Sequence, residues 1–123
     1  MSLIKVLIIP ASPLEPATAT DIEAGLVSLQ SQVGGYIESV PGGDFNGASA
    51  DSWCAYVNEE GKVLNLPVNV RATAIMHSIE KIHPWDTING PMVVVGVDGD
   101  GESVDAPEEL TAGRLLEILN KAA

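Results

Sequence analysis

Four short runs of mostly apolar residues stand out along the chain, and each predicts a β-strand: residues 4–9, 36–40, 53–57 and 92–97. The first and the last run are almost continuously apolar, which is typical of central strands with both faces buried. We expect a further strand over residues 63–68, although Pro67 cannot donate a backbone hydrogen bond and would keep that strand out of the centre of a sheet.

Three segments with apolar residues three or four positions apart predict helices that bury one face. The first begins at Thr20 or Asp21, whose side chains suit an N-cap, and ends at Gly34, because glycine readily adopts the left-handed conformation of a helix C-terminus. The second begins at Asn69, another N-cap residue, and ends before Pro84. The apolar stripes of the three helices consist of Ile22, Leu26, Leu29 and Val33; Ala72, Ile75, Ile79 and Ile82; and Ala112, Leu115, Leu116 and Leu119.

Two connections carry turn signals. Residues 41–52 form a long loop that is rich in Gly, Asp, Asn, Ser and Ala, and long loops in compact domains are either functional or disordered. Residues 58–61 are predicted to be the turn of a β-hairpin between the strands at 53–57 and 63–68, with Gly61 at a positive φ angle.

The order of the predicted elements, β-α-β-β-β-α-β-α, indicates one α+β domain over residues 1–123. We expect one mixed β-sheet of about five strands, with two to three helices packed on one of its faces. The other face would carry alternate residues of the predicted hairpin and the long loop above them.

Charge is the most unusual property of the composition. Six Lys and Arg residues stand against seventeen Asp and Glu residues, for a net charge of −11. Binding to nucleic acid needs many basic side chains against the phosphates, so we expect no direct nucleic-acid ligand. The acidic surface either keeps the protein soluble or meets a basic protein partner, for instance by imitating nucleic acid.

The chain also indicates a cytoplasmic environment. It holds a single cysteine, Cys54, so no intrachain disulfide is possible. The apolar run at residues 3–9 is too short for the core of a signal peptide and meets Pro10 at once. No apolar run approaches the roughly 20 residues that a membrane helix needs, so we expect no membrane association.

The loop at residues 98–109 partly matches a calcium-binding loop. Asp98, Asp100 and Glu102 alternate, and Glu109 follows at the position of the last ligand. Ser103 stands where such loops need glycine, and Asp105 stands where they place an apolar residue. These departures favour an acidic turn without a metal ion.

No catalytic or cofactor-binding residues can be assigned. Cys54 could pair with His77 or His83 as nucleophile and base, but its apolar surroundings favour a packing role. The two histidines are six positions apart and do not share a helix face, which is unfavourable for zinc. The sequence also lacks the common nucleotide-binding and hydrolase motifs.

The remaining candidates belong to an interaction surface. Aromatic residues near loops often anchor partners, although the same residues also build the core. Acidic residues at the predicted hairpin tip and in the loop after residue 97 would add charge. The predicted surface consists of Phe45, Trp53, Tyr56, Trp85, Glu59, Glu60, Asp98, Asp100, Glu102 and Asp105.

Three segments between residues 29 and 102, LQSQVGGYIESV, VNEEGKVLNLPVNVRAT and DTINGPMVVVGVDGDGE, resemble a small uncharacterised family from bacteriophages, plasmids and actinobacterial or firmicute genomes. The resemblance implies a domain of unknown function from a phage or another mobile element, acting in the host cytoplasm. It implies no catalytic residues.

Three hypotheses of function follow. The preferred one is a non-catalytic accessory protein that binds a basic host or phage protein through its acidic, loop-rich surface. The second is a module that binds a small molecule or a nucleotide, using glycine-flanked strand ends. The third is an enzyme with an unrecognised site.

Overall fold

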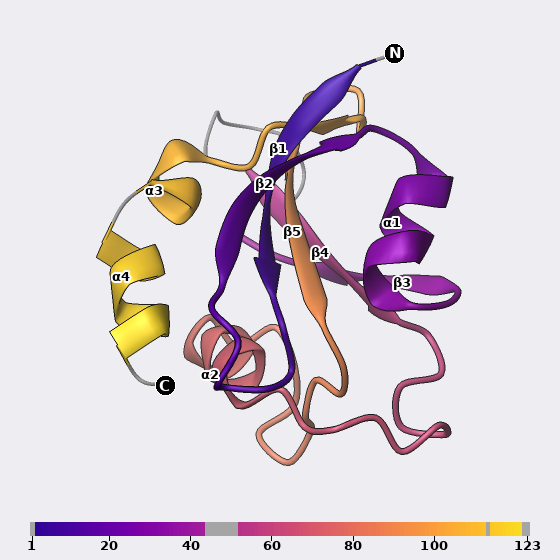
Figure 1. Ribbon diagram of the computed structural model, residues 1–123, viewed down its shortest axis with the longest axis vertical. Coiled ribbons are helices and arrows are strands. Elements are labelled where there is room, and N and C mark those ends of the chain that lie inside the picture. The colour runs from indigo at the N-terminus through magenta and orange to yellow at the C-terminus, as the bar shows by residue number, and fades with distance from the viewer. Residues whose placement is uncertain (1, 44–51, 113, 122–123) are drawn as a thin grey trace.

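The chain folds around a single antiparallel sheet with helices on both faces (Figure 1). A computed structural model describes residues 2–43, 52–112 and 114–121. The strands are β1 (Leu3–Ile9), β2 (Thr18–Glu23), β3 (Ile37–Pro41), β4 (Trp53–Asn58), β5 (Met92–Val97) and β6 (Ser103–Val104). The helices are α1 (Leu26–Val33), α2 (Val70–Ser78), α3 (Glu108–Thr111) and α4 (Arg114–Lys121).

The strand order is β2-β1-β5-β4-β3, and the short β6 pairs with the end of β5. All the strand pairs formed by the described residues are antiparallel. The α+β class is therefore confirmed, but the sheet is antiparallel rather than mixed. The two most apolar runs, β1 and β5, lie side by side at its centre, as their sequences predict.

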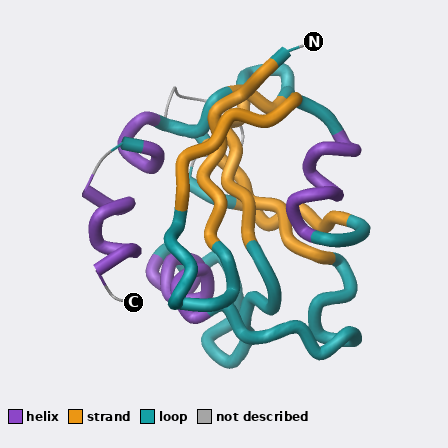
Figure 2. The backbone as a smooth tube through the Cα atoms, viewed as in Figure 1, coloured by secondary structure: helices purple, strands orange, loops and turns teal. Residues whose placement is uncertain are grey.

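Helices cover both faces of the sheet, which corrects the expectation of one covered face (Figure 2). On one face, Leu29 and Val33 of α1 pack against side chains of β1 and β5. On the other, Met76 of α2 and Leu119 of α4 pack against Leu7 and its neighbours. The physical reason is the continuous apolar character of β1 and β5, because alternate side chains of such strands point to opposite faces and both sets must leave water.

Residues 18–23 form a strand, whereas the sequence favoured the first turn of a helix there. β2 pairs with β1 over six residue pairs, from Leu3↔Glu23 to Ile8↔Thr18. Helix α1 begins only after Gly25, which has a φ of 136°. The backbone hydrogen bonds between β2 and β1 outweigh the local N-cap signal of Thr20 and Asp21. If residues 18–23 formed a helix, the backbone groups on this side of β1 would lose their partners.

Residues 63–68 do not form the predicted strand. Residues 63–65 continue the turn that follows β4, and Val68 makes an isolated bridge to Asn89. The hairpin partner of β4 is instead β3, through the connection at residues 42–52, so residues 58–61 do not join two strands. Gly61 is not at a positive φ; it is needed because a Cβ atom there would lie 2.6 Å from the backbone oxygen of Asn89.

Helix boundaries follow the sequence in part. Gly34 ends α1 with a φ of 78°, as predicted, and its N–H donates to the Gln30 carbonyl. Helix α2 ends at Ser78 rather than near Ile82. Helix α4 lies in the region of the last predicted helix, and α3 begins at Glu108, in a segment that the sequence predicts as loop. Among the described residues, no helix is both long and apolar enough to cross a membrane.

Asn69 fixes the end of α2 to the centre of the sheet. It is the predicted N-cap, and its Oδ1 accepts a hydrogen bond from the Ala72 N–H at 3.0 Å. Its Nδ2 donates to the backbone oxygens of Ile9 at 2.8 Å and Gly90 at 3.0 Å. The side chain is fully buried, so these bonds join the end of β1, the approach to β5 and the start of α2 without competition from water.

Candidate functional site

A concave cleft with polar and charged lining lies beside β3, on the face of the sheet that α2 covers. The cleft has a volume of about 340 Å³ and is lined by residues 38–41, 57–59, 61–63, 82 and 86–89. Val40 and the buried Val57 supply its sheet side, and both belong to the core cluster around α2. The opposite wall is formed by two segments without regular structure, residues 61–63 and 86–89.

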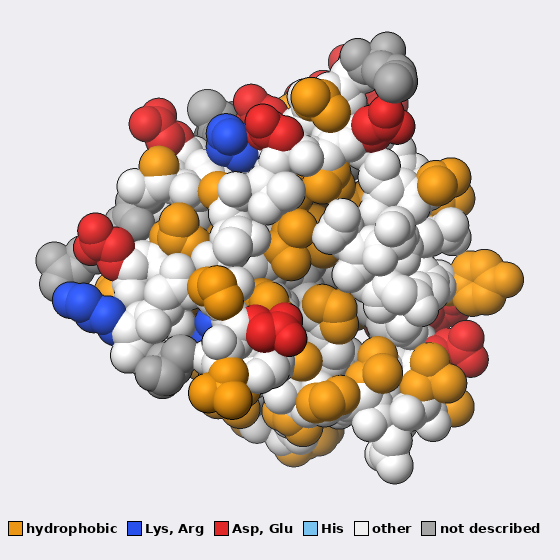
Figure 3. Space-filling view, viewed as in Figure 1, with side chains coloured by type: hydrophobic (Ala, Val, Ile, Leu, Met, Phe, Trp, Pro, Cys, Tyr) orange, Lys and Arg blue, Asp and Glu red, His pale blue; other side chains and the backbone are white. Residues whose placement is uncertain are grey.

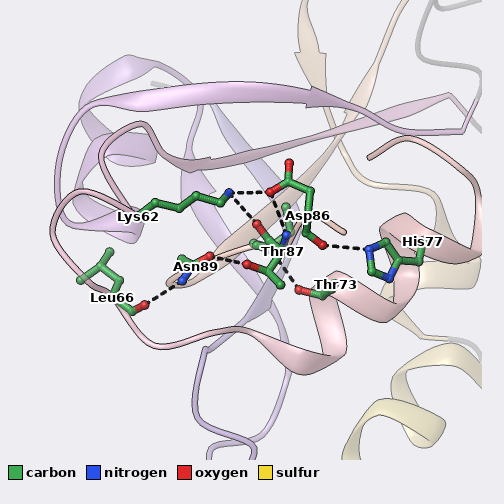
Figure 4. A network of polar contacts seen from close by, with 8 residues as sticks. Lys62, Leu66, Thr73, His77, Asp86, Thr87 and Asn89 are labelled. Carbon is green, nitrogen blue, oxygen red and sulfur yellow. Dashed lines mark hydrogen bonds and ion pairs between the residues drawn. The ribbon is translucent and has the colours of Figure 1, made fainter. Parts of the chain in front are cut away.

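Lys62 and Asp86 link the two segments of that wall (Figure 4). The Lys62 ammonium donates to the Asp86 carboxylate at 2.8 Å and to the Thr87 carbonyl at 2.8 Å. The Asp86 carboxylate also accepts the Thr87 N–H at 2.8 Å. The hydrogen bond from Lys62 is the main reason why the pKa of Asp86 lies below its ordinary value.

Further hydrogen bonds hold the segment at residues 86–89 in place (Figure 4). His77 of α2 bonds through Nε2 to the Asp86 carbonyl at 2.9 Å, and Thr73 of α2 accepts the Ile88 N–H at 2.9 Å. Asn89 donates from Nδ2 to the Leu66 carbonyl at 3.0 Å and accepts the Thr87 hydroxyl proton at 2.7 Å between oxygens. The wall is thus fixed to α2 and to the segment after β4, so the cleft is preformed.

The rim of the cleft is β3, the last strand of the sheet. The Glu59 N–H donates to the Tyr36 carbonyl at 2.9 Å, which makes Tyr36 and Glu59 a hydrogen-bonded pair. In an antiparallel ladder such pairs alternate along each strand. With the register Glu38↔Val57 and Val40↔Ala55, these residues bond to β4, whereas the backbone groups of Ile37, Ser39 and Pro41 point away from it.

Pro41 fits this assignment, because a proline at an edge position removes a donor that no neighbouring strand uses. In the part of the chain that the structure describes, no further strand pairs with β3. The N–H groups of Ile37 and Ser39 and the carbonyls of all three outward-pointing residues therefore form an edge that can accept another strand.

The cleft carries excess negative charge. Its charged lining residues are Glu38, Glu59, Asp86 and Lys62. Lys62 and Asp86 compensate each other, and Glu38 and Glu59 are exposed. A Lys or Arg side chain is the complement of these two carboxylates.

The predicted acidic surface is divided between the two ends of the sheet. β4 and β5 pair from Trp53↔Gly96 to Val57↔Met92, so Glu59 and Glu60 follow one end of this pair and Asp98 follows the other. Figure 3 likewise shows carboxylates in separate groups on the face in view. Glu59 lines the cleft, and the exposed Glu60 is adjacent to it in the chain.

The acidic turn after β5 uses part of its charge internally. The Asp98 carboxylate accepts the N–H groups of Asp100 and Glu102, both at 2.9 Å, and the Asp105 carboxylate accepts the Lys5 N–H at 2.8 Å. Asp100 and Glu102 are exposed. No group of three or more His, Cys, Asp or Glu side chains in the described ranges could hold a metal ion.

The predicted aromatic contacts fall into different environments. Trp53 is buried and packs in the core on the α2 face, so it is not a surface contact. Tyr56 is half-buried on the opposite face with Cys54, and burial raises the pKa of both groups. Trp85 is 79% exposed and stacks on His83 with ring centroids 4.5 Å apart. Phe45 lies outside the described residues.

Sequence reasoning missed the residues that define the cleft. The sequence predicts a strand at Glu38 and Ser39, but only Pro41 at its end marks that strand as an edge. Asp86 and Asn89 bond to residues 62–66 only because the segment after β4 folds back as an irregular wall.

The fold and the cleft define a small α+β domain with a preformed acidic cleft at the edge of an antiparallel sheet. The chain belongs to the family described as a domain of unknown function (DUF3846), which matches residues 4–120. The resemblance to an uncharacterised family is therefore confirmed. No curated protein matches the chain.

A crystal structure of the small RNA methyltransferase HEN1 contains a similar fold. The TM-score is 0.58 at 16% sequence identity, and the match covers 86% of this chain but 15% of the methyltransferase chain. At this identity the likeness shows the fold alone.

Proposed function

We propose that this protein acts without catalysis, by binding a basic segment of a protein partner. The observation that carries the proposal is the preformed cleft lined by Glu38 and Glu59, in which the charge of Lys62 is already matched by Asp86. Glu38 and Glu59 have no cationic partner among the described residues. On a protein of net charge −11 they favour cationic ligands, both by local pairing and by long-range steering. The family resemblance supports a setting in which this partner is a host or phage protein in a bacterial cytoplasm.

A displayed library of random linear peptides tests the class of ligand. We expect selection on the immobilised protein to enrich peptides with Lys or Arg. Their binding should weaken as the ionic strength approaches 0.15 M, where the Debye length is about 8 Å.

Two double variants with the same change in net charge locate the contact. Glu38→Gln with Glu59→Gln should abolish the enrichment, whereas Asp100→Asn with Glu102→Gln, at the other end of the sheet, should leave it unchanged. If only the Asp100→Asn and Glu102→Gln variant lost the enrichment, the contact would lie at the turn after β5 instead. Peptides without basic residues, or no enrichment at all, would contradict the proposal and favour a small-molecule ligand of the cleft.

A further inference from the structure

The outer edge of β3 and the acidic cleft lie on the same strand, and this combination specifies a mode of binding. Ile37 and Ser39 direct their backbone N–H and C=O groups away from β4, and Pro41 directs its carbonyl the same way. The edge is short and its last position lacks a donor, which limits uncontrolled pairing with other chains. At Ile37 and Ser39 the edge still offers both an N–H donor and a C=O acceptor to an added strand.

We propose that the basic partner segment binds in an extended conformation as an additional strand on β3, with a Lys or Arg side chain directed into the cleft. This inference rests on the proposed function and names its geometry. The backbone bonds would provide affinity that does not depend on sequence, and the side chains that face the cleft would provide selectivity.

The side-chain directions along β3 determine which partner position is basic. Val40 packs with the core cluster of the α2 face, whereas Ile37 packs with the cluster on the α1 face. Because side chains alternate, Glu38 shares the face of Val40 and points to the cleft that it lines. The partner residue opposite Glu38 points to the same face, within the roughly 5 Å between Cβ atoms of directly opposed residues. A basic residue there meets Glu38, which lines the same cleft as Glu59.

Charge also favours a different protein over a second copy of this chain as the occupant. Pairing of two β3 edges would bring together two molecules that each carry −11, and would bring Glu38 and Glu59 of both copies to one interface. Like charges in close opposition are destabilising. A segment with alternating basic and apolar residues removes this repulsion.

Amide hydrogen exchange measured by NMR tests the proposal with a defined probe, a capped synthetic peptide in which Lys and Val alternate over about the length of β3. At a peptide concentration about ten times its Kd, exchange at Ile37 and Ser39 should slow about tenfold, because only unbound molecules exchange. Glu38 and Val40, which already bond to β4, should change little and serve as internal controls.

A second peptide separates strand addition from simple charge attraction. It has the same residues but carries N-methyl groups on alternate backbone nitrogens, so it keeps its charge and cannot pair with an edge. We expect it to bind at least tenfold more weakly than the unmodified peptide. Ser39→Pro, which removes the outward donor, should weaken the unmodified peptide similarly, whereas Ser39→Ala should not; the melting temperature of each variant verifies the fold.

The outcomes distinguish the two proposals. Equal binding of both peptides, or binding without protection of Ile37 and Ser39, would overturn strand addition and leave recognition of basic segments intact. No binding of either peptide would overturn both. Protection of Ile37 and Ser39 that grows with protein concentration in the absence of peptide would show a second copy at the edge and would likewise overturn the inference.

Discussion

Removing the buried amide of Asn69 should destabilise the protein strongly, because one side chain satisfies groups from three elements. Asn69→Ala removes the N-cap bond to Ala72, which costs about 1 kcal/mol. It also removes the donor to the carbonyls of Ile9 and Gly90, and a buried group left unsatisfied costs about 1–3 kcal/mol. The cap and the two unsatisfied carbonyls together give an expected loss of roughly 3–7 kcal/mol, within a total stability of about 6–18 kcal/mol for a chain of this length.

Two matched substitutions separate the cap from the donors. Asn69→Ser keeps an acceptor for the Ala72 N–H but cannot donate to both carbonyls. Its loss of unfolding free energy should therefore be smaller than that of Asn69→Ala by about 1 kcal/mol, the contribution of the cap. Asn69→Asp also keeps the acceptor, but it directs a second oxygen at the carbonyls of Ile9 and Gly90. At neutral pH this variant should be at least as unstable as Asn69→Ala, because a buried carboxylate faces two carbonyl oxygens.

The stability of Asn69→Asp should also depend on pH, with a sign that follows from the buried position of the carboxyl. Burial and the two carbonyls raise the folded-state pKa of the introduced carboxyl above its unfolded value of about 3.9. Its stabilising, protonated form is fully present below that unfolded value and is lost as the pH rises through the folded-state pKa. The difference in stability between Asn69→Asp and wild type should thus narrow from pH 7 to pH 4, while that of Asn69→Ala stays constant.

Urea unfolding followed by circular dichroism measures all three variants, with the change in denaturation midpoint at unchanged slope giving the free-energy difference. A loss below about 1 kcal/mol for Asn69→Ala would refute the reasoning, since the cap alone accounts for that amount. Parallel pH dependences of stability for the Ala and Asp variants would also refute the reasoning. They would show that the introduced carboxylate does not interact with the carbonyls of Ile9 and Gly90.

Two further predictions concern the wall of the cleft. Gly61→Ala should lower the free energy of unfolding by about 1–3 kcal/mol, because the new methyl group would lie 2.6 Å from the Asn89 carbonyl oxygen. The control Gly99→Ala should be nearly neutral, because nothing lies within 4 Å of a Cβ atom at that position. Equal urea midpoints for the two variants would contradict the close approach at Gly61. Lys62→Met should raise the pKa of Asp86 toward its ordinary value, as followed by NMR titration of that carboxyl. In the wild type this pair stabilises the fold above the unfolded pKa of Asp86 and stops doing so as the pH falls through the folded pKa, so the variant should lose less stability in acid; an unchanged titration would show that Lys62 does not cause the shift.

The candidate site was only partly predictable. The charged turn at residues 58–61 predicts Glu59 and Glu60 as contacts, and Glu59 lines the cleft. Trp53 was equally plausible as a contact, because an aromatic residue next to a loop has the same sequence signature in a core and at a surface. Its burial is decided by the position of β4 inside the sheet. Glu38 and Ser39 gain their importance only because β3 has a neighbour on one side.

The sequence by itself determined the elements whose local signals and burial agree. The apolar runs of β1 and β5 must lie inside a covered sheet wherever they pair, Asn69 must cap the helix that follows it, and Gly34 can end α1 in a conformation that other residues avoid. Tertiary structure decided what depends on partners far away in the chain. Residues 18–23 became a strand because the edge of β1 was available, and residues 63–68 did not because β3 already occupied the edge of β4. Backbone hydrogen bonds are satisfied by whichever segment lies alongside, and a local pattern cannot say which segment that is.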